Sequence, residues 1–99
     1  MIFTISEKQG PHGLLLVITD TDILGKKFVE DKKQLDLTVE FYQGEEKSKE
    51  EIYKLLEKAR DIHATGKHSV GLLVEKEIVD PNNIIYIQGI PHAQVVVGD

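Results

Sequence analysis

Residues 48–66, SKEEIYKLLEKARDIHATG, carry the clearest structural signal in the 99-residue chain. Ser48 and Glu51 have the spacing of a capping box, in which the serine hydroxyl and the glutamate carboxylate satisfy backbone amides reciprocally. Apolar residues then recur at three- and four-residue spacing, which is typical of one buried helix face. The pattern predicts a helix over Lys49–Thr65, ended by Gly66.

A second helix is predicted directly after the first, with Ser69 as its N-cap and an end near Ile78. Strands are predicted on both sides of these helices, from alternating apolar residues or short apolar runs bounded by glycine and proline. They cover Ile2–Ser6, Leu14–Thr19, Lys27–Val29, Leu35–Val39, Ile84–Gln88 and His92–Val97. The expected fold is α+β: a single small domain over residues 1–99, with N- and C-terminal β-hairpins in a mostly antiparallel sheet packed by two consecutive central helices.

Composition argues against several classes of protein. The charges sum to −5 at pH 7, so the chain as a whole does not attract a polyanion, and DNA is not an expected partner. The longest run of strongly apolar residues is Leu14–Ile18, far shorter than the roughly 20 residues of a membrane span. The absence of cysteine excludes disulfides and thiolate chemistry. A soluble, intracellular protein is expected.

Motifs of enzyme and metal chemistry are incomplete in this sequence. The apolar run Leu14–Thr19 leads into Asp20 and Asp22, as the nucleophile strand does in haloacid-dehalogenase phosphatases. The repeated strand–helix–strand units of that fold are missing, so a capped turn after the strand is the preferred interpretation. His63 and His68 lack a recognisable third ligand for zinc. No metal or cofactor is therefore expected.

A local basic patch lies between positions 26 and 33, where four lysines stand against two acidic residues, a local sum of +2. Lysines grouped in this way can contact the phosphates of a nucleic-acid backbone. They can equally protect an exposed edge strand from pairing with another chain. Lys26 and Lys27 are the candidates for phosphate contacts.

The stretch from Pro81 to Gly98 contains no charged residue, although 29% of the whole chain is charged. In a strand, His92 and Gln94 would share one face. This pattern fits a hairpin buried on both faces, with its polar groups paired internally. It fits equally a polar, uncharged surface on which the His92 imidazole and the Gln94 amide meet a ligand.

Several phrases of the sequence together resemble one protein family. They occur in a fixed order along the chain: Leu24–Phe28 (LGKKF), Glu40–Glu45 (EFYQGE), His68–Val70 (HSV), Val79–Pro81 (VDP) and Gly89–Gln94 (GIPHAQ). Across nearly its whole length the chain is similar to the archaeal family called domain of unknown function 424, and the last phrase is the most specific part of the likeness.

The resemblance implies a small, cytoplasmic, archaeal protein with an α+β fold. It also implies association with translation genes, including that for the beta subunit of archaeal initiation factor two. The family motifs mark ten positions in this chain: Gly25, Lys26, Phe28, Phe41, Tyr42, Gly44, Gly89, Pro91, His92 and Gln94. Among these, the glycines, Phe28, Phe41 and Pro91 suit turns and packing.

The leading hypothesis is a non-enzymatic accessory module for the translation or RNA apparatus. Lys26 and Lys27 would contact phosphate, while Tyr42, His92 and Gln94 would contact a base, a sugar or a protein surface. RNA and a protein partner, such as an initiation factor or a ribosomal protein, both remain open, and so does the oligomeric state. The alternative is a small hydrolase-like enzyme with His92 as acid or base, aided by one of the two aspartates after the second strand.

Overall fold

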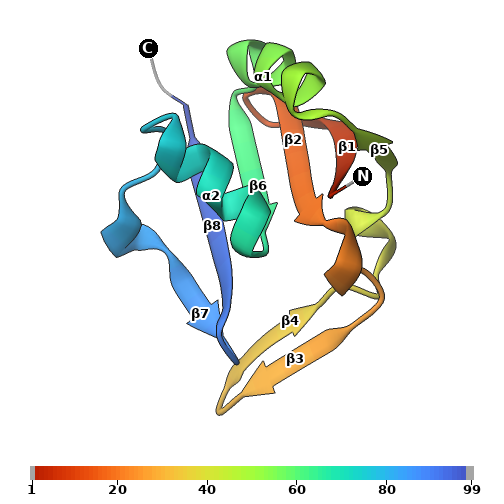
Figure 1. Cartoon of the computed structure of the whole chain (residues 1–99), viewed down its shortest axis with the longest axis vertical. Helices are drawn as coiled ribbons and strands as arrows, with labels where there is room; N and C mark the ends of the chain where they lie inside the picture. The colour runs from red at the N-terminus through yellow and green to blue at the C-terminus, as the bar shows by residue number, and fades with distance from the viewer. Residues whose placement is uncertain (1, 98–99) are drawn as a thin grey trace.

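The structure, a computed structural model, describes residues 2–97 and is built on a six-stranded sheet (Figure 1). Its strands lie in the order β5 (Glu45–Lys47), β1 (Phe3–Gly10), β2 (Gly13–Asp20), β6 (Asp61–Thr65), β8 (Ile90–Val96) and β7 (Ile85–Ile87). β2 and β6 run parallel, and every other neighbouring pair in this order is antiparallel. A two-stranded ribbon, β3 (Lys27–Glu30) with β4 (Lys33–Asp36), lies beside the sheet. The α+β class is thus confirmed.

The predicted helix over Lys49–Thr65 is correct only in its first half. Helix α1 covers Lys49–Lys58 and begins with the expected capping box at Ser48. Residues 61–65 instead form the central strand β6, which pairs with β2 on one side and β8 on the other. An apolar residue at every second position of this short segment fits a strand as well as a helix, and pairing on both sides satisfies its backbone.

The two helices are therefore not consecutive, because β6 lies between them. Helix α2 covers Lys67–Glu75, and Gly66 is its N-cap rather than the end of the preceding helix. Ser69 lies inside this helix and is fully buried, so the prediction that it is the N-cap is wrong. Local sequence identified a helix start here but misplaced it by two to three residues, as helix ends often are.

Both helices lie on one face of the sheet, in front of it in Figure 1. Their apolar side chains and those of the strands form the main core. Ile52 of α1 and Leu73 of α2 pack there against Ile18 and Ile62 of the two parallel strands, and all four are completely buried. None of the helices within residues 2–97 is long and apolar enough to cross a membrane.

The opposite face of the sheet is covered only in part. The β3–β4 ribbon and the short 3-10 turn η2 (Glu40–Tyr42) lie over its lower half, where Leu35 and Leu37 form a second apolar cluster with Ile87. The strand predicted over Leu35–Val39 ends earlier, at Asp36, and Val39 is 44% exposed. These segments leave the rest of this outer face of the sheet uncovered, and we call it the open face.

Gly44 joins η2 to the edge strand β5 at a very close approach between backbones. A Cβ atom at this position would lie 2.1 Å from the carbonyl oxygen of Ile5 on β1. Only glycine allows two chain segments to pass at this distance. Of the other residues marked for turns, Gly25 follows the turn after β2, and Gly89 lies in the turn between β7 and β8.

Candidate functional site

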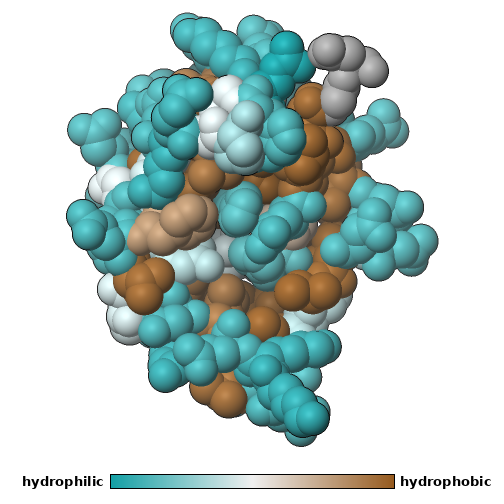
Figure 2. Space-filling model, turned by 180° about the vertical axis from the view of Figure 1, so that it is seen from behind, coloured by the Kyte–Doolittle hydropathy of each residue, from teal (hydrophilic) through white to brown (hydrophobic). Residues whose placement is uncertain are grey.

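The outward side chains of β6 and β8 lie on the open face of the sheet, where Gln94 is exposed and His63 half-buried, whereas Thr65 and His92 are buried. Ile62 and Ala64 of β6 point into the helix-covered core, so by alternation His63 and Thr65 point to the opposite face. In register with them across the ladder, Gln94 lies beside His63 and His92 lies beside Thr65. Figure 2 shows the molecule from this side, where polar side chains in teal lie among apolar ones in brown.

Four rings form a continuous row across this face, which we call the ring row: Tyr42, Phe41, His63 and His92. The centroids of successive rings lie 5.1, 5.4 and 6.3 Å apart, all in edge-to-face arrangements. Segments far apart in the sequence therefore build one surface: η2 supplies the first two rings, and two neighbouring strands supply the others. The ammonium nitrogen of Lys8 on β1 lies 5.3 Å from the centre of the Phe41 ring. This contact places one positive charge on the row.

Hydrogen bonds determine the tautomer of His92. Its Nε2 atom lies 3.2 Å from the amide nitrogen of Gln94, which can only donate, so Nε2 is the acceptor. The proton of the neutral ring then lies on Nδ1, which donates to the hydroxyl of Thr65 at 2.8 Å. The ring itself is buried, with 6% of its surface exposed. A buried imidazole with both nitrogens engaged is held in one orientation.

Both histidines of the ring row are held in the neutral form. Burial lowers the pKa of His92 below its ordinary value, and the neighbouring His63 lowers it further. Burial also lowers the pKa of His63, although the carboxylate of Asp61 opposes that shift. The two imidazoles of the row are therefore uncharged at neutral pH.

The lowered pKa values predict that acid destabilises the fold. Below about pH 6.5, the ordinary histidine value, the unfolded chain binds protons that the native rings resist, so the free energy of unfolding falls until the lowered native pKa values are passed. Urea titrations between about pH 7 and about pH 5 give the slope of the free energy of unfolding against pH, and His92→Asn should reduce this slope. The same change at the exposed His68 is the control. An unchanged slope in H92N, or an equal change in both variants, would contradict the prediction.

The structure separates the candidate residues into two groups. His92 and Gln94 are hydrogen-bonded neighbours on β8, and Tyr42 lies at the far end of the ring row. Lys26 and Lys27 instead lie at the start of the β3–β4 ribbon, where both are exposed. Lys27 pairs across the ribbon with Asp36. The predicted phosphate contacts therefore lie on a different element from the two polar residues of β8.

His63 is the residue of the ring row whose element was wrongly predicted, since it lies in β6 and not in the helix expected over Lys49–Thr65. Phe41 is expected to serve packing, and its ring does pack between Tyr42 and His63 in the row. No sequence signal linked Lys8 to Phe41, because the two residues are 33 positions apart (41 − 8) and meet only in the folded sheet.

Asp20 has a structural role on the other face. Its carboxylate accepts hydrogen bonds from the backbone N–H groups of His68 and Ser69, at 2.9 and 2.7 Å, and from the Ser69 hydroxyl at 2.7 Å. It thus caps the first turn of α2 from the end of β2. This arrangement contradicts both the phosphatase comparison and the idea that Asp20 assists His92. Ser69 is likewise a donor to Asp20 rather than an available nucleophile.

The two histidines considered for zinc lie on different elements and different faces of the sheet, His63 on β6 and His68 on α2. Within residues 2–97, no group of three or more potential metal ligands comes together.

Fold and site together define an α+β protein with helices on one face of its sheet and a row of rings on the other. The chain belongs to the family described as "Protein of unknown function (DUF424)", which matches residues 7–97. A solved structure with a similar fold is that of an uncharacterized conserved protein from Methanopyrus kandleri, with 18% sequence identity and a TM-score of 0.76. The match covers 98% of this chain and 94% of that one. No curated protein matches the chain significantly.

Proposed function

We propose that this protein is a non-enzymatic module that binds single-stranded RNA on the open face of its sheet. The observation that carries the proposal is the ring row, in which Tyr42, Phe41 and His63 are half-buried. The row continues past the buried His92 to the exposed amide of Gln94, which is hydrogen-bonded to that imidazole. Proteins that recognise unpaired RNA stack splayed bases on aromatic side chains and contact their edges with uncharged polar groups. A role in translation is the context that the family resemblance implies.

The charge distribution supports contacts to bases more than contacts to phosphates. A chain with a net charge of −5 gains little from long-range attraction to RNA, so affinity would depend on the rings. Lys8 beside Phe41 supplies one phosphate contact next to the row. Lys26 and Lys27 are proposed as further phosphate contacts, reached by a strand that runs on past Tyr42 towards the β3–β4 ribbon.

The proposal predicts loss of RNA affinity when the row is interrupted at Phe41. Fluorescence anisotropy with labelled homopolymers of about eight nucleotides should show binding that Phe41→Leu weakens by about tenfold, because each stacked base contributes about 1–3 kcal/mol. The control is Tyr53→Leu, which removes a half-buried ring of α1 on the other side of the sheet. Equal losses in both variants, or no binding to any homopolymer at about 50 mM salt, would overturn the proposal.

Salt dependence separates the two kinds of contact. Lys8→Gln should reduce the slope of log affinity against log salt by about one, because one phosphate contact is lost.

The ligand of the row could instead be a protein, and nuclease treatment distinguishes the two. Phe41→Leu would also weaken the binding of a partner protein to this face, but that binding would survive nuclease treatment. That result would replace RNA by a ribosomal or initiation-factor protein as the ligand of the row.

A second candidate, a small hydrolase-like enzyme, is favoured by one observation. At neutral pH the Nε2 atom of His92 carries a lone pair. Once the Gln94 amide moves away, the imidazole can accept a proton there and act as a general base. Asp20 is engaged with α2 and does not assist it. Turnover of a hydrolysable substrate that is lost in His92→Asn, with a pH profile that follows the imidazole, would establish this function instead.

A further inference from the structure

The outer face of α2 has a feature that the chain itself does not require. Gly71 lies exposed in the middle of this helix, where glycine is the least favourable residue after proline. A Cβ atom there would stand in open space, with no atom of residues 2–97 within 4 Å apart from its own helix and chain neighbours. Bare backbone at such a position allows another surface to approach closely.

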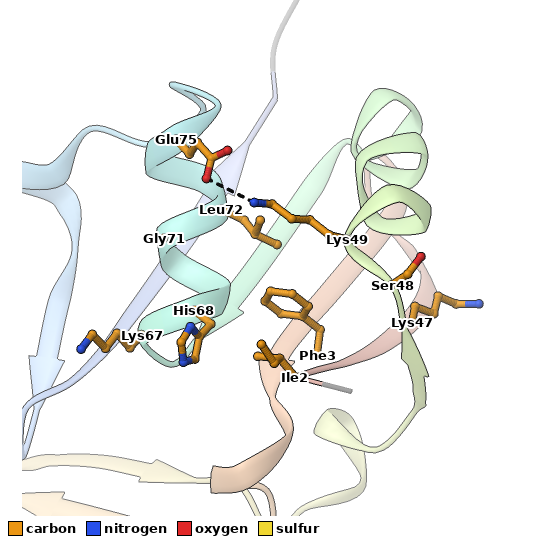
Figure 3. Close-up of a pocket in the computed structure, with 10 residues that line it drawn as sticks. All are labelled: Ile2, Phe3, Lys47, Ser48, Lys49, Lys67, His68, Gly71, Leu72 and Glu75. Carbon is orange, nitrogen blue, oxygen red and sulfur yellow. Dashed lines mark ion pairs between the residues drawn. The ribbon is translucent and has the colours of Figure 1, made fainter.

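Two apolar grooves flank the helix at this point. One, of about 590 Å³, lies between α2 and α1 over Phe3, with Ile2 and Leu72 also lining it (Figure 3). The other, of about 650 Å³, lies between α2 and β7 and is lined by Val74 and Tyr86 among others. Lys67, Gly71 and Glu75 line both grooves, and they form the ridge between them.

The charges on this ridge are symmetric about the glycine. Lys67 lies four residues before Gly71 and Glu75 four residues after it, at the two ends of α2 in Figure 3. If a second α2 crosses antiparallel at Gly71, each lysine faces the glutamate of the other helix. Such a surface is complementary to itself, as a two-fold symmetric interface requires.

We propose that the outer face of α2 binds a second copy of this chain, with the two helices antiparallel and in contact at Gly71. The two ridges then meet, and the residues that flank the partner's ridge cover the grooves beside α2. Glu75 remains accessible for the contact, since its side chain is 58% exposed even with Lys49 at 3.6 Å. The interface lies on the helix-covered side and leaves the ring row free, so this proposal stands independently of RNA binding.

Sedimentation equilibrium over a wide range of protein concentration tests the proposal. The native chain should reach the mass of a dimer, and Gly71→Gln should raise the dissociation constant by at least about tenfold. The thermal midpoint of the monomer should not fall in this variant, because the added side chain meets open space. Glu57→Gln, on the exposed side of α1, is the control and should leave the dissociation constant unchanged.

Charge reversal identifies the pairing directly. Lys67→Glu and Glu75→Lys should each weaken the dimer, and the double variant should restore it. Rescue cannot arise within one helix, because eight residues separate the two side chains by about 12 Å. A native chain that stays monomeric at the highest concentration, a dimer that Gly71→Gln leaves intact, or a double variant without rescue would overturn the proposal.

Discussion

Asp20→Ala is expected to lower the free energy of unfolding by about 3 kcal/mol or more, the largest effect of any single side-chain removal proposed for this chain. The carboxylate is 3% exposed and accepts three hydrogen bonds from His68 and Ser69. Its loss leaves two backbone amides and a hydroxyl without their acceptor at the start of α2, and buried donors without partners are costly. Urea denaturation followed by circular dichroism measures the change.

Two further variants make the result specific. Asp22→Ala removes an exposed carboxylate two residues away and should change stability by no more than about 0.5 kcal/mol. Asp20→Asn keeps one acceptor oxygen and should fall between the native chain and Asp20→Ala. If Asp20→Ala and Asp22→Ala cost the same, Asp20 does not cap α2 as described.

Gly66→Ala is expected to cost about 3 kcal/mol for two separate reasons. The φ angle of Gly66 is +107°, a conformation that side chains with a Cβ rarely adopt. A Cβ atom there would also lie 2.3 Å from the carboxyl carbon of Asp20. The same denaturation experiment measures the loss. A native-like midpoint would show that the backbone can relax without displacing the Asp20 cap.

The double variant separates these two reasons. Asp20→Ala removes the closest overlaps, those with the carboxyl carbon and Oδ2, but leaves the Cβ of residue 20 at 2.7 Å from the new side chain. Asp20→Ala with Gly66→Ala should therefore cost less than the sum of the single changes, by about 1 kcal/mol or more. The backbone strain at Gly66 would remain in both backgrounds. Strict additivity would mean that the overlap with the carboxylate contributes nothing, and the cost of Gly66→Ala would then come from its φ angle and from the contact with the Cβ of residue 20.

Local patterns predicted the parts of the fold that depend on neighbouring residues. The apolar run of β2 and the alternation of β8 identified two of the central strands, and the capping box identified the first residue of α1. The same reasoning failed over Asp61–Thr65, where a helix was expected. A five-residue segment with apolar residues two apart does not distinguish strand from helix by itself.

The candidate site was predictable to a similar extent. The uncharged stretch from Pro81 to Gly98 indicated His92 and Gln94 as candidate residues, and these two do lie together on the open face. Phe41 and His63 could not be assigned to the same site, because they come from a 3-10 turn and a strand that meet only after folding. Lys26 and Lys27, selected for their charge, lie on the separate β3–β4 ribbon.

The amino-acid sequence by itself determined the α+β class, the start of α1 and the uncharged character of β8, because each depends on spacing within a few residues. Only the tertiary structure decided that Asp61–Thr65 is a central strand, since its backbone is satisfied by β2 and β8, which are distant in the chain. The same holds for Asp20. Its carboxylate caps a helix 48 residues further along, and no local pattern in the sequence can show a hydrogen bond that exists only after the sheet has assembled.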